Sequence, residues 1–136
     1  MNGEIWVLDA SAFVKLIRTE AESDVLRQWA SQRHLVSSAL LRTEARRAVA
    51  DEGSAVRHQC ERLLANTDLL ELTSAMLDAA GRIPGRNLRT LDAIYLACAQ
   101  QIGDDLSGLV SYDPRQVAAA DALGISTVSP GKSAGV

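Results

Sequence analysis

Cysteine, histidine and aromatic residues are scarce in this sequence of 136 residues, and each shortage argues against a class of protein. Two cysteines are too few for a disulfide framework. With no CxxC pair and only two histidines, a zinc site of the Cys/His kind is nearly excluded. Cys60 and Cys98 lie in segments with helical spacing of apolar residues, so we expect two buried free thiols. Aromatic residues make up 4% of the chain, which limits binding of single-stranded nucleic acid by base stacking.

Long apolar runs are absent as well. No run approaches the ~20 residues needed to span a bilayer, and no basic N-terminal region leads into an apolar stretch as in a signal peptide. We therefore expect a cytoplasmic protein with no membrane partner. With 47% hydrophobic and 23% charged residues, the composition is that of an ordinary globular protein. We expect one domain over residues 1–129 and a flexible C-terminal tail over residues 130–136.

A strong excess of charge of one sign is also lacking. The chain has 17 acidic and 14 basic residues, which gives a formal charge of −3. At first sight this balance argues against a protein that holds nucleic acid by bulk positive charge.

Short apolar segments alternate along the chain with segments of helical periodicity. The predicted strands cover residues 4–8, 34–37, 69–72, 107–111 and 125–128. The predicted helices cover residues 11–18, 21–31, 39–50, 54–66, 74–82, 91–102 and 114–123, with Ser38 and Thr90 as N-caps of the third and sixth. Strands that are apolar throughout are typical of a parallel sheet covered on both faces. The sequence thus predicts an α/β fold with three layers, α/β/α, around a short, mostly parallel sheet.

Four acidic residues stand apart from the other thirteen, most of which fall on polar faces or in loops. Asp9 and Asp113 follow predicted strands, at the edge where open α/β sheets bind ligands. Asp92 lies in the first turn of a predicted helix, and Glu44 lies at the margin of the apolar face in the middle of another.

Each of these acids also has a purely structural interpretation. Asp9 and Asp113 could cap the helices that follow them, and Asp92 could complement a helix dipole. Glu44 could pair with Arg46 or Arg47 on its own helix.

Taken together, the four acids indicate a metal site. Converging carboxylates stay ionised only if a cation neutralises them. Oxygen ligands without His or Cys suit Mg²⁺, or alternatively Mn²⁺. The chemistry that this pattern favours is metal-assisted hydrolysis of a phosphodiester.

Arginines gather next to two of the four acids in the sequence. Arg82, Arg86 and Arg89 lead into the predicted helix of Asp92. The group around Glu44 consists of Arg42, Arg46 and Arg47. Either group could be an ordinary solvated face, but arginine also suits bidentate phosphate contacts. Arg42, Arg46, Arg86 and Arg89 are therefore our candidates for RNA contacts.

The order and spacing of these motifs resemble those of PIN-domain proteins, most closely the VapC-like toxins of bacterial toxin–antitoxin pairs. The matching segments are Val7-Leu8-Asp9-Ala10-Ser11-Ala12, Ser38-Ala39-Leu40-Leu41-Arg42-Thr43-Glu44, Arg89-Thr90-Leu91-Asp92-Ala93-Ile94-Tyr95-Leu96-Ala97 and Leu109-Val110-Ser111-Tyr112-Asp113. The resemblance covers nearly the whole chain, from Ile5 to about Val128.

The resemblance implies an acidic, metal-binding quartet at the catalytic site, formed by Asp9, Glu44, Asp92 and Asp113. It places the hydroxyl of Ser11 beside the metal, and Ser111 where the family often has Ser or Thr. It also implies an Mg²⁺-dependent endoribonuclease toxin that cuts structured RNA, tRNA or rRNA, and so stops translation. Such proteins usually form homodimers, and a cognate VapB-like antitoxin blocks the site, often with a basic side chain among the acids.

Two other classes of function are considered. The first is a non-catalytic binding module of the same fold, whose acids hold a partner's arginines within a regulatory complex. The second is a phosphatase or nucleotide-binding protein of doubly wound type. The sequence supports it less well, because the chain has neither GxGxxG nor GxxxxGK[ST].

The proposed site also changes the meaning of the net charge. Without its four acids, 13 acidic residues face 14 basic ones, so the rest of the chain is slightly positive. The charge of −3 is then compatible with an RNA substrate.

Overall fold

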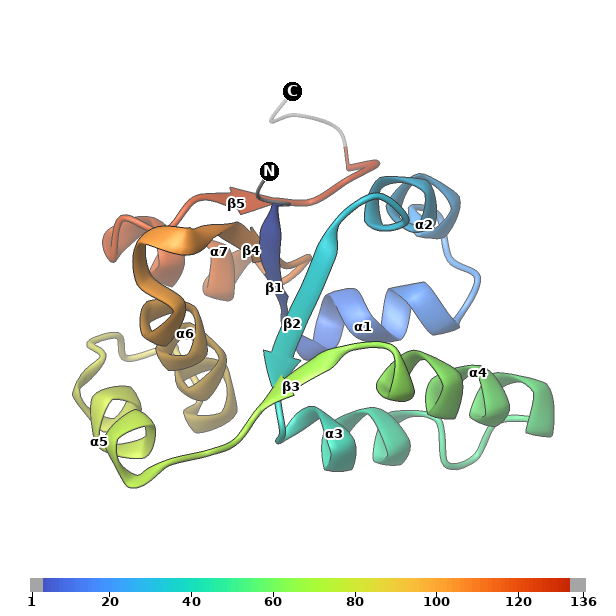
Figure 1. Ribbon diagram of the computed structural model, residues 1–136, viewed down its shortest axis with the longest axis horizontal. Helices are drawn as coiled ribbons and strands as arrows, with labels where there is room; N and C mark the ends of the chain where they lie inside the picture. Colours follow the sequence, from blue (N-terminus) through green and yellow to red (C-terminus); the bar gives the residue numbers. More distant parts are fainter. Residues whose placement is uncertain (1–3, 133–136) are drawn as a thin grey trace.

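The structure is a computed structural model that describes residues 4–132 (Figure 1). Along these residues the elements are β1 (Ile5–Leu8), α1 (Ala10–Ile17), α2 (Ser23–Ala30), β2 (His34–Ser38), α3 (Leu41–Ala48), α4 (Ser54–Ala65), β3 (Asp68–Leu70), α5 (Ser74–Arg82), α6 (Thr90–Ile102), a 3₁₀ turn η1 (Gly103–Asp105), β4 (Leu106–Val110), α7 (Pro114–Ala122) and β5 (Thr127–Val128).

The five strands form one sheet in the order β3-β2-β1-β4-β5, and all its pairs are parallel. The predicted α/β class with a parallel sheet is confirmed. The central strand β1 is buried from Trp6 to Leu8 because helices cover both faces of the sheet.

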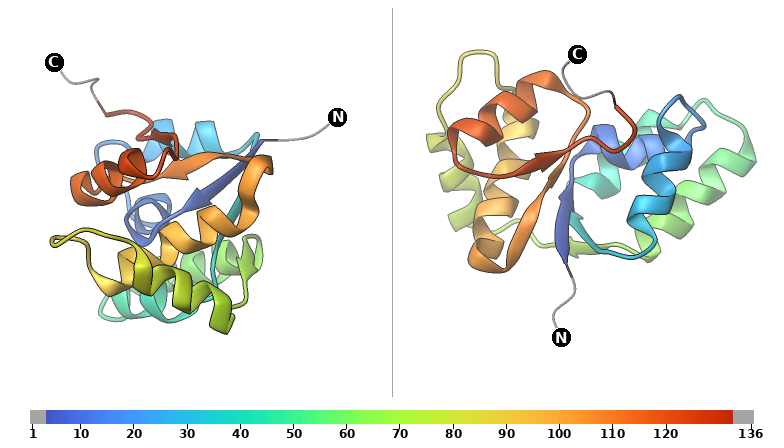
Figure 2. Two further views of the ribbon diagram at one scale, coloured as in Figure 1. Left: turned by 90° about the vertical axis from the view of Figure 1, so that its left-hand side faces the viewer. Right: turned by 90° about the horizontal axis from the view of Figure 1, so that it is seen from above.

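Helices α1 to α4 lie on one side of the sheet and α5 to α7 on the other, which gives the three predicted layers (Figures 1 and 2). Successive residues of a strand point to opposite faces. Leu8 therefore joins the core on the side of α1, with Phe13 and Leu26, while Val7 joins the core beneath α6 and α7, with Leu96.

Two predicted helix starts are wrong by one or two residues. Ser38 is the last residue of β2, where it pairs with Leu70, rather than the N-cap of the next helix. Its hydroxyl instead accepts a hydrogen bond from the amide of Leu40, and α3 begins at Leu41. Thr90 is the first residue of α6, whose N-cap is the extended Arg89. Pairing with a neighbouring strand keeps Ser38 extended, and the local sequence does not reveal that pairing.

Other local predictions agree with the structure. Pro114 opens α7, and Gly103 ends α6 with a positive φ of 69°, a conformation that glycine adopts without strain. Cys60 and Cys98 are buried free thiols. The strands β3 and β5 are shorter than predicted, at three and two residues.

Strands β1 and β4 meet in an unusually close contact at Gly108. The pairing shifts register there, between Ile5 and Trp6. A Cβ atom added to Gly108 would come within 2.6 Å of the Trp6 ring and 2.7 Å of the Ser126 carbonyl oxygen. Only glycine leaves room for Trp6 at this point, which fixes the position of the strand that carries Asp9.

The predicted C-terminal tail begins at Pro130, whose carbonyl accepts a hydrogen bond of 2.6 Å from the hydroxyl of Tyr112. Residues 133–136 of that tail lie outside the described part of the chain. Between residues 4 and 132, none of the helices has the length and apolar character needed to cross a membrane.

Candidate active site

Each of the four acids stands at the beginning of a helix. Asp9, directly after β1, caps α1 and accepts a hydrogen bond of 3.0 Å from the amide of Ala12. Asp113, three residues after β4, caps α7 and accepts one of 3.0 Å from the amide of Arg115. The structural interpretation of both residues is thus confirmed, but each cap uses only Oδ1 and leaves Oδ2 for another partner.

Glu44 and Asp92 lie in the first turns of α3 and α6. The prediction that Glu44 lies in the middle of its helix is wrong, because α3 starts later than expected. The N-terminus of a helix carries partial positive charge, which favours anionic side chains. The fold therefore supports each of the four negative charges with a separate helix.

Asp9 is the most buried of the four acids, with 3% of its surface exposed. Burial raises the pKa of its carboxyl, and the nearby charge of Asp92 adds to this effect. Hydrogen bonds from the hydroxyls of Ser11 and Ser111 and from the Ala12 amide oppose the rise without cancelling it.

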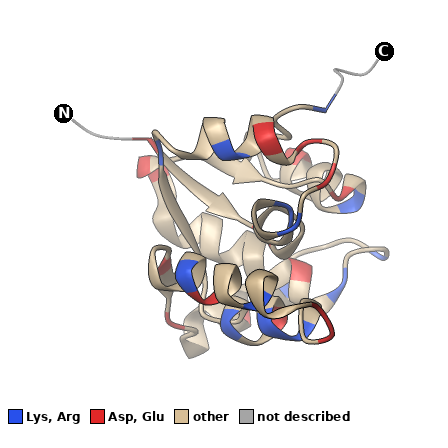
Figure 3. Ribbon diagram, turned by 90° about the vertical axis from the view of Figure 1, so that its right-hand side faces the viewer, with Lys and Arg blue, Asp and Glu red and all other residues tan. Residues whose placement is uncertain are grey.

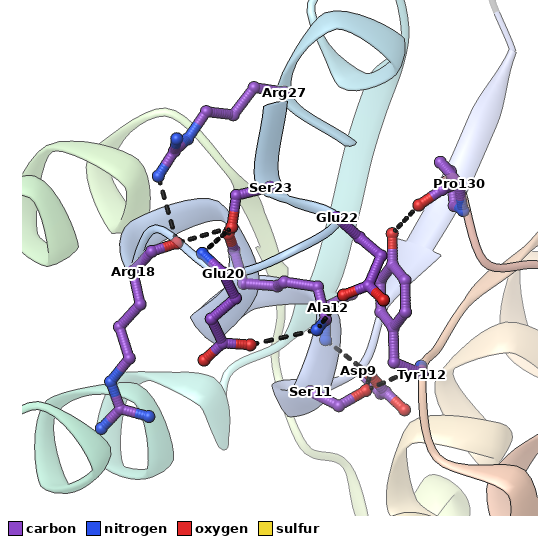
Figure 4. Close-up of polar contacts among 11 residues, drawn as sticks. Asp9, Ser11, Ala12, Arg18, Glu20, Glu22, Ser23, Arg27, Tyr112 and Pro130 are labelled. Atoms are coloured by element: carbon purple, nitrogen blue, oxygen red, sulfur yellow. Dashed lines mark hydrogen bonds and ion pairs between the residues drawn. The ribbon is translucent and has the colours of Figure 1, made fainter. Parts of the chain in front are cut away.

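Ser11 connects the ends of the two central strands. Its hydroxyl donates to Oδ1 of Asp9 at 2.6 Å and accepts from the backbone amide of Tyr112 at 3.0 Å. Figure 4 shows these three residues together. The buried Ser111 is similarly placed, since its hydroxyl accepts from the amide of Asp113 at 3.1 Å. Both serines thus hold the backbone that presents the acids.

Asp92 has an unsatisfied oxygen. Its Oδ2 is buried and has no hydrogen-bond partner among the described residues, and the closest cation is Nε of Arg89 at 4.0 Å. Burial raises the pKa of Asp92, and the charge of Asp113 raises it further. These electrostatic effects connect Asp92 to both Asp9 and Asp113.

Glu44 is held by a residue that the sequence pattern did not identify. The hydroxyl of Tyr95, a side chain with 1% exposure, donates to Oε1 of Glu44 at 2.6 Å. Burial and the carboxylate of Glu44 both raise the pKa of Tyr95, so the phenol stays protonated and donates. Helical periodicity places Tyr95 with Leu91, Ile94 and Cys98 on the apolar face of its helix, so the sequence pattern predicts a core residue. Its spacing of three from Asp92 was the available signal, because residues three apart share a helix face.

The candidate arginines differ in their contacts. Arg46 does not pair with Glu44 but makes a two-pronged contact with Glu61, at 2.9 and 2.8 Å. Figure 3 shows basic and acidic residues interleaved on the face that it presents, rather than a basic patch. Arg42 and Arg86 are exposed and make no ion pair within the described residues.

The donor set suits a hard divalent cation. The free oxygens of Asp9, Asp92 and Asp113 are carboxylate oxygens, and the buried Oδ2 of Asp92 lacks the partner that a cation would supply. In residues 4–132, no group of three His, Cys, Asp or Glu side chains could hold a metal ion as they stand. Side-chain rotations would thus be needed to bring the carboxylates together around one ion.

Residues 6–122 match the family described as PIN domain. The chain belongs to the PIN-domain family. The fold and the order of its elements are those expected from the resemblance.

Within this family the chain is similar to VapC proteins. It is 48% identical over 124 residues to Ribonuclease VapC46 of Mycobacterium tuberculosis, covering 90% of this chain and 95% of that protein. The solved structure of M. tuberculosis VapC20, a "Sarcin-Ricin loop cleaving toxin", matches with a TM-score of 0.70 and 18% identity over 92% of this chain and 99% of that one. A toxin–antitoxin complex from Klebsiella pneumoniae matches with a TM-score of 0.69 and 16% identity, covering 91% and 96%. The two structural matches show the fold alone.

Proposed function

We propose that this protein is a divalent-metal-dependent endoribonuclease that acts as the toxin of a toxin–antitoxin pair. The observation that carries the proposal is the unpartnered, buried Oδ2 of Asp92, close to the carboxylates of Asp9 and Asp113. Burying an anionic oxygen without a partner is costly, and a bound cation would offset that cost. The name of the relative at 48% identity, Ribonuclease VapC46, supports the same reaction.

Asp9, Asp92 and Asp113 would hold Mg²⁺ or Mn²⁺, with Glu44 completing the set. When bound, such an ion lowers the pKa of a coordinated water and stabilises the charge that develops on the phosphate. The protein's part is to fix its carboxylates. Ser11 and the Ala12 amide orient Asp9, and Tyr95 orients Glu44. The chemistry needs ionised carboxylates, so cleavage declines at low pH as Asp9 and Asp92 take up protons.

The proposed substrate is a structured RNA, either tRNA or rRNA, in the cytoplasm. VapC20, a toxin of the same fold that cleaves the sarcin–ricin loop, supports a folded target. Few aromatic side chains are available for stacking along a single strand, which favours recognition by shape and phosphate contacts. Arg42, Arg86 and Arg89 are the proposed phosphate contacts, whereas Arg46 would first have to leave Glu61.

The proposed regulator is a cognate VapB-like antitoxin, by analogy with the Klebsiella toxin–antitoxin complex of the same fold. Because Arg89 already lies 4.0 Å from Asp92, the site attracts a guanidinium. An arginine of the antitoxin would therefore compete with the metal. We also propose that the protein forms a homodimer. Within residues 4–132, the large apolar side chains exposed to solvent, which a partner subunit could cover, are Val25, Leu77 and Leu91.

The test of this function uses the chain purified free of any antitoxin. Incubation with total tRNA and with ribosomes should give discrete RNA fragments when Mg²⁺ or Mn²⁺ is present. EDTA should abolish the fragments, whereas an inhibitor of common contaminating ribonucleases should not. The Asp92→Asn variant should neither cleave RNA nor arrest growth. Undiminished toxicity of that variant would exclude the mechanism.

The second candidate is a non-catalytic binding module whose acids hold a partner's arginines. The approach of Arg89 to Asp92 is the observation that favours it. In that case the isolated chain binds neither Mg²⁺ nor Mn²⁺ at millimolar concentration, and it protects RNA or a partner protein without cutting either.

A further inference from the structure

A pocket of ≈ 450 Å³ lies between the loop of residues 83–88 and helix α7. We call it the α7 pocket, and its lining includes Pro84, Arg86, Asn87, Pro114, Arg115 and Ala118. In both views of Figure 2 the loop, drawn in yellow, runs alongside α7, drawn in orange-red. We propose that this pocket binds one unpaired nucleotide of the RNA, next to the phosphate that is cleaved. The proposal rests on the proposed ribonuclease function.

Each wall of the pocket adjoins one of the acids, Asp113 on the α7 side and Asp92 on the side of the loop. Its α7 wall begins with Pro114, the residue after Asp113. Its loop wall ends at Leu88, which precedes Arg89 and the first turn of α6 with Asp92. Consecutive Cα atoms are about 3.8 Å apart. A nucleotide in the pocket would therefore follow directly on a phosphate held at the acids.

The lining of the pocket combines two kinds of surface that a nucleotide requires. The rings of Pro84 and Pro114 and the methyl group of Ala118 offer flat apolar contacts. Arg86 and Arg115 are exposed, and neither makes an ion pair within the described residues. Guanidinium planes stack on unpaired bases and also contact phosphate.

Among residues 4–132, no acidic side chain lines the α7 pocket, although acids outnumber bases in the chain as a whole. Asn87 is the one amide side chain among these described lining residues, and it can donate to and accept from the edge of a base. Positive charge, apolar walls and one amide together complement a nucleotide better than an acidic peptide, which would leave the apolar walls unmatched.

The loop wall is already formed. The amide of Leu88 donates to the carbonyl of Gly85 at 3.3 Å, which closes the turn. Leu88 then packs against the core beneath α6 and α7. A pocket that does not have to order itself on binding loses less free energy when the nucleotide arrives.

The test uses four 5′-mononucleotides, AMP, GMP, CMP and UMP, titrated into the full-length protein without metal. Amide signals are followed by NMR, so the readout does not depend on cleavage. We expect one or more nucleotides to shift the amides of Asn87, Arg115 and Ala118. The Arg115→Ala variant should weaken this binding about tenfold, the effect of losing a hydrogen bond to a charged group. Ala118→Phe, which fills the pocket, should abolish the binding.

Matched controls lie on the opposite layer of the protein. Arg57 and Ala55 are exposed residues of α4, so Arg57→Ala and Ala55→Phe make the same chemical changes away from the pocket. Both control variants should bind nucleotides as the wild type does. Equal loss of binding in a control and in its pocket variant would overturn the proposal.

Three further results would overturn it as well. They are an absence of shifts at the pocket, identical shifts with inorganic phosphate alone, and shifts with poly-glutamate but not with nucleotides. The last result would assign the pocket to an acidic protein partner. The titration is repeated on Asp9→Asn, which separates the two proposals. Binding by this inactive variant supports the pocket whether or not the wild type cleaves RNA, while cleavage without nucleotide binding refutes the pocket alone.

Discussion

Asp9 is buried to a degree that is unusual for a carboxylate, and its raised pKa has a consequence for stability. The ordinary pKa of the carboxyl is 3.8, and the folded protein holds the proton more tightly than the unfolded chain. Its contribution to the free energy of unfolding is therefore fully present below pH 3.8 and is lost as pH rises through the folded-state pKa.

Asn does not ionise, so replacing Asp9 with Asn removes this loss of unfolding free energy at neutral pH. Asn caps helices as well as Asp does, so the bond from the Ala12 amide can persist. We expect Asp9→Asn to raise the free energy of unfolding of the metal-free protein at pH 7 by on the order of 1 kcal/mol. Urea unfolding at several pH values measures this. If Asp9→Asn is less stable than the wild type at pH 7, and its free energy of unfolding depends on pH as strongly, then the ionised carboxylate of Asp9 does not destabilise the fold.

Tyr95 is a positioning residue for Glu44. The Tyr95→Phe variant keeps the ring in the core but loses the hydrogen bond of 2.6 Å to the carboxylate. Loss of such an outer contact weakens metal affinity or activity by about 10–100-fold. We expect the dissociation constant for Mn²⁺ to rise by this factor, without a matching loss of thermal stability.

The control for this prediction is Tyr112→Phe. It removes a hydroxyl that bonds the carbonyl of Pro130, and it should leave the Mn²⁺ dissociation constant unchanged. Wild-type affinity in Tyr95→Phe would show that Glu44 needs no support.

At the scale of single residues, the sequence indicated the four acids together with Ser11 and Ser111, but it did not indicate the contact of Tyr95 with Glu44. Asp9 and Asp113 were found because they follow apolar strands. Tyr95 was missed because periodicity places a side chain on a face of a helix, and it cannot say where a hydroxyl at the end of that side chain points.

At the scale of elements, the contact between β1 and β4 at Gly108 fixes where Asp9 is presented. Gly108→Ala should lower the free energy of unfolding by about 1–3 kcal/mol, because the added Cβ clashes with the Trp6 ring and a backbone carbonyl. The midpoint of urea unfolding measures the change.

Gly81 provides the matched substitution. It lies in α5 with nothing within 4 Å of an added Cβ, and its φ is not positive. Gly81→Ala should therefore stabilise the protein by about 0.5–1 kcal/mol. Equal effects of the two substitutions would refute the steric argument for Gly108.

The type and order of the elements were predictable because their apolar periodicity is strong. Their ends were less so. Ser38 has the residue type of an N-cap, but its pairing with Leu70 keeps it in a strand. The strand pairings join residues that lie from 18 to 102 positions apart in the sequence, and the order β3-β2-β1-β4-β5 follows from them rather than from local sequence.

At the scale of the whole molecule, we expect the acids to dominate the response to the proposed RNA substrate. In the absence of metal the four negative charges should repel phosphate. Neutralising two of them in the double variant Asp9→Asn/Asp92→Asn should increase metal-free affinity for bulk tRNA. The expected gain is roughly fivefold per charge, or about 1 kcal/mol at contact distance in water.

Filter binding at low and at moderate salt measures this effect, which should shrink as salt screens the charges. The control is the double variant Asp104→Asn/Asp105→Asn, which neutralises two exposed acids of the turn η1. If the wild type without metal binds tRNA as tightly as Asp9→Asn/Asp92→Asn, then the acids do not face the RNA.

We propose that Asp9, Asp92 and Asp113 form a site for a divalent cation. Titration of the isolated chain with Mn²⁺, followed by electron paramagnetic resonance, tests it most directly. We predict saturable binding in the millimolar range or tighter, its loss in Asp92→Asn, and its retention in Asp104→Asn. Binding that is absent from the wild type, or unchanged in Asp92→Asn, would contradict the account.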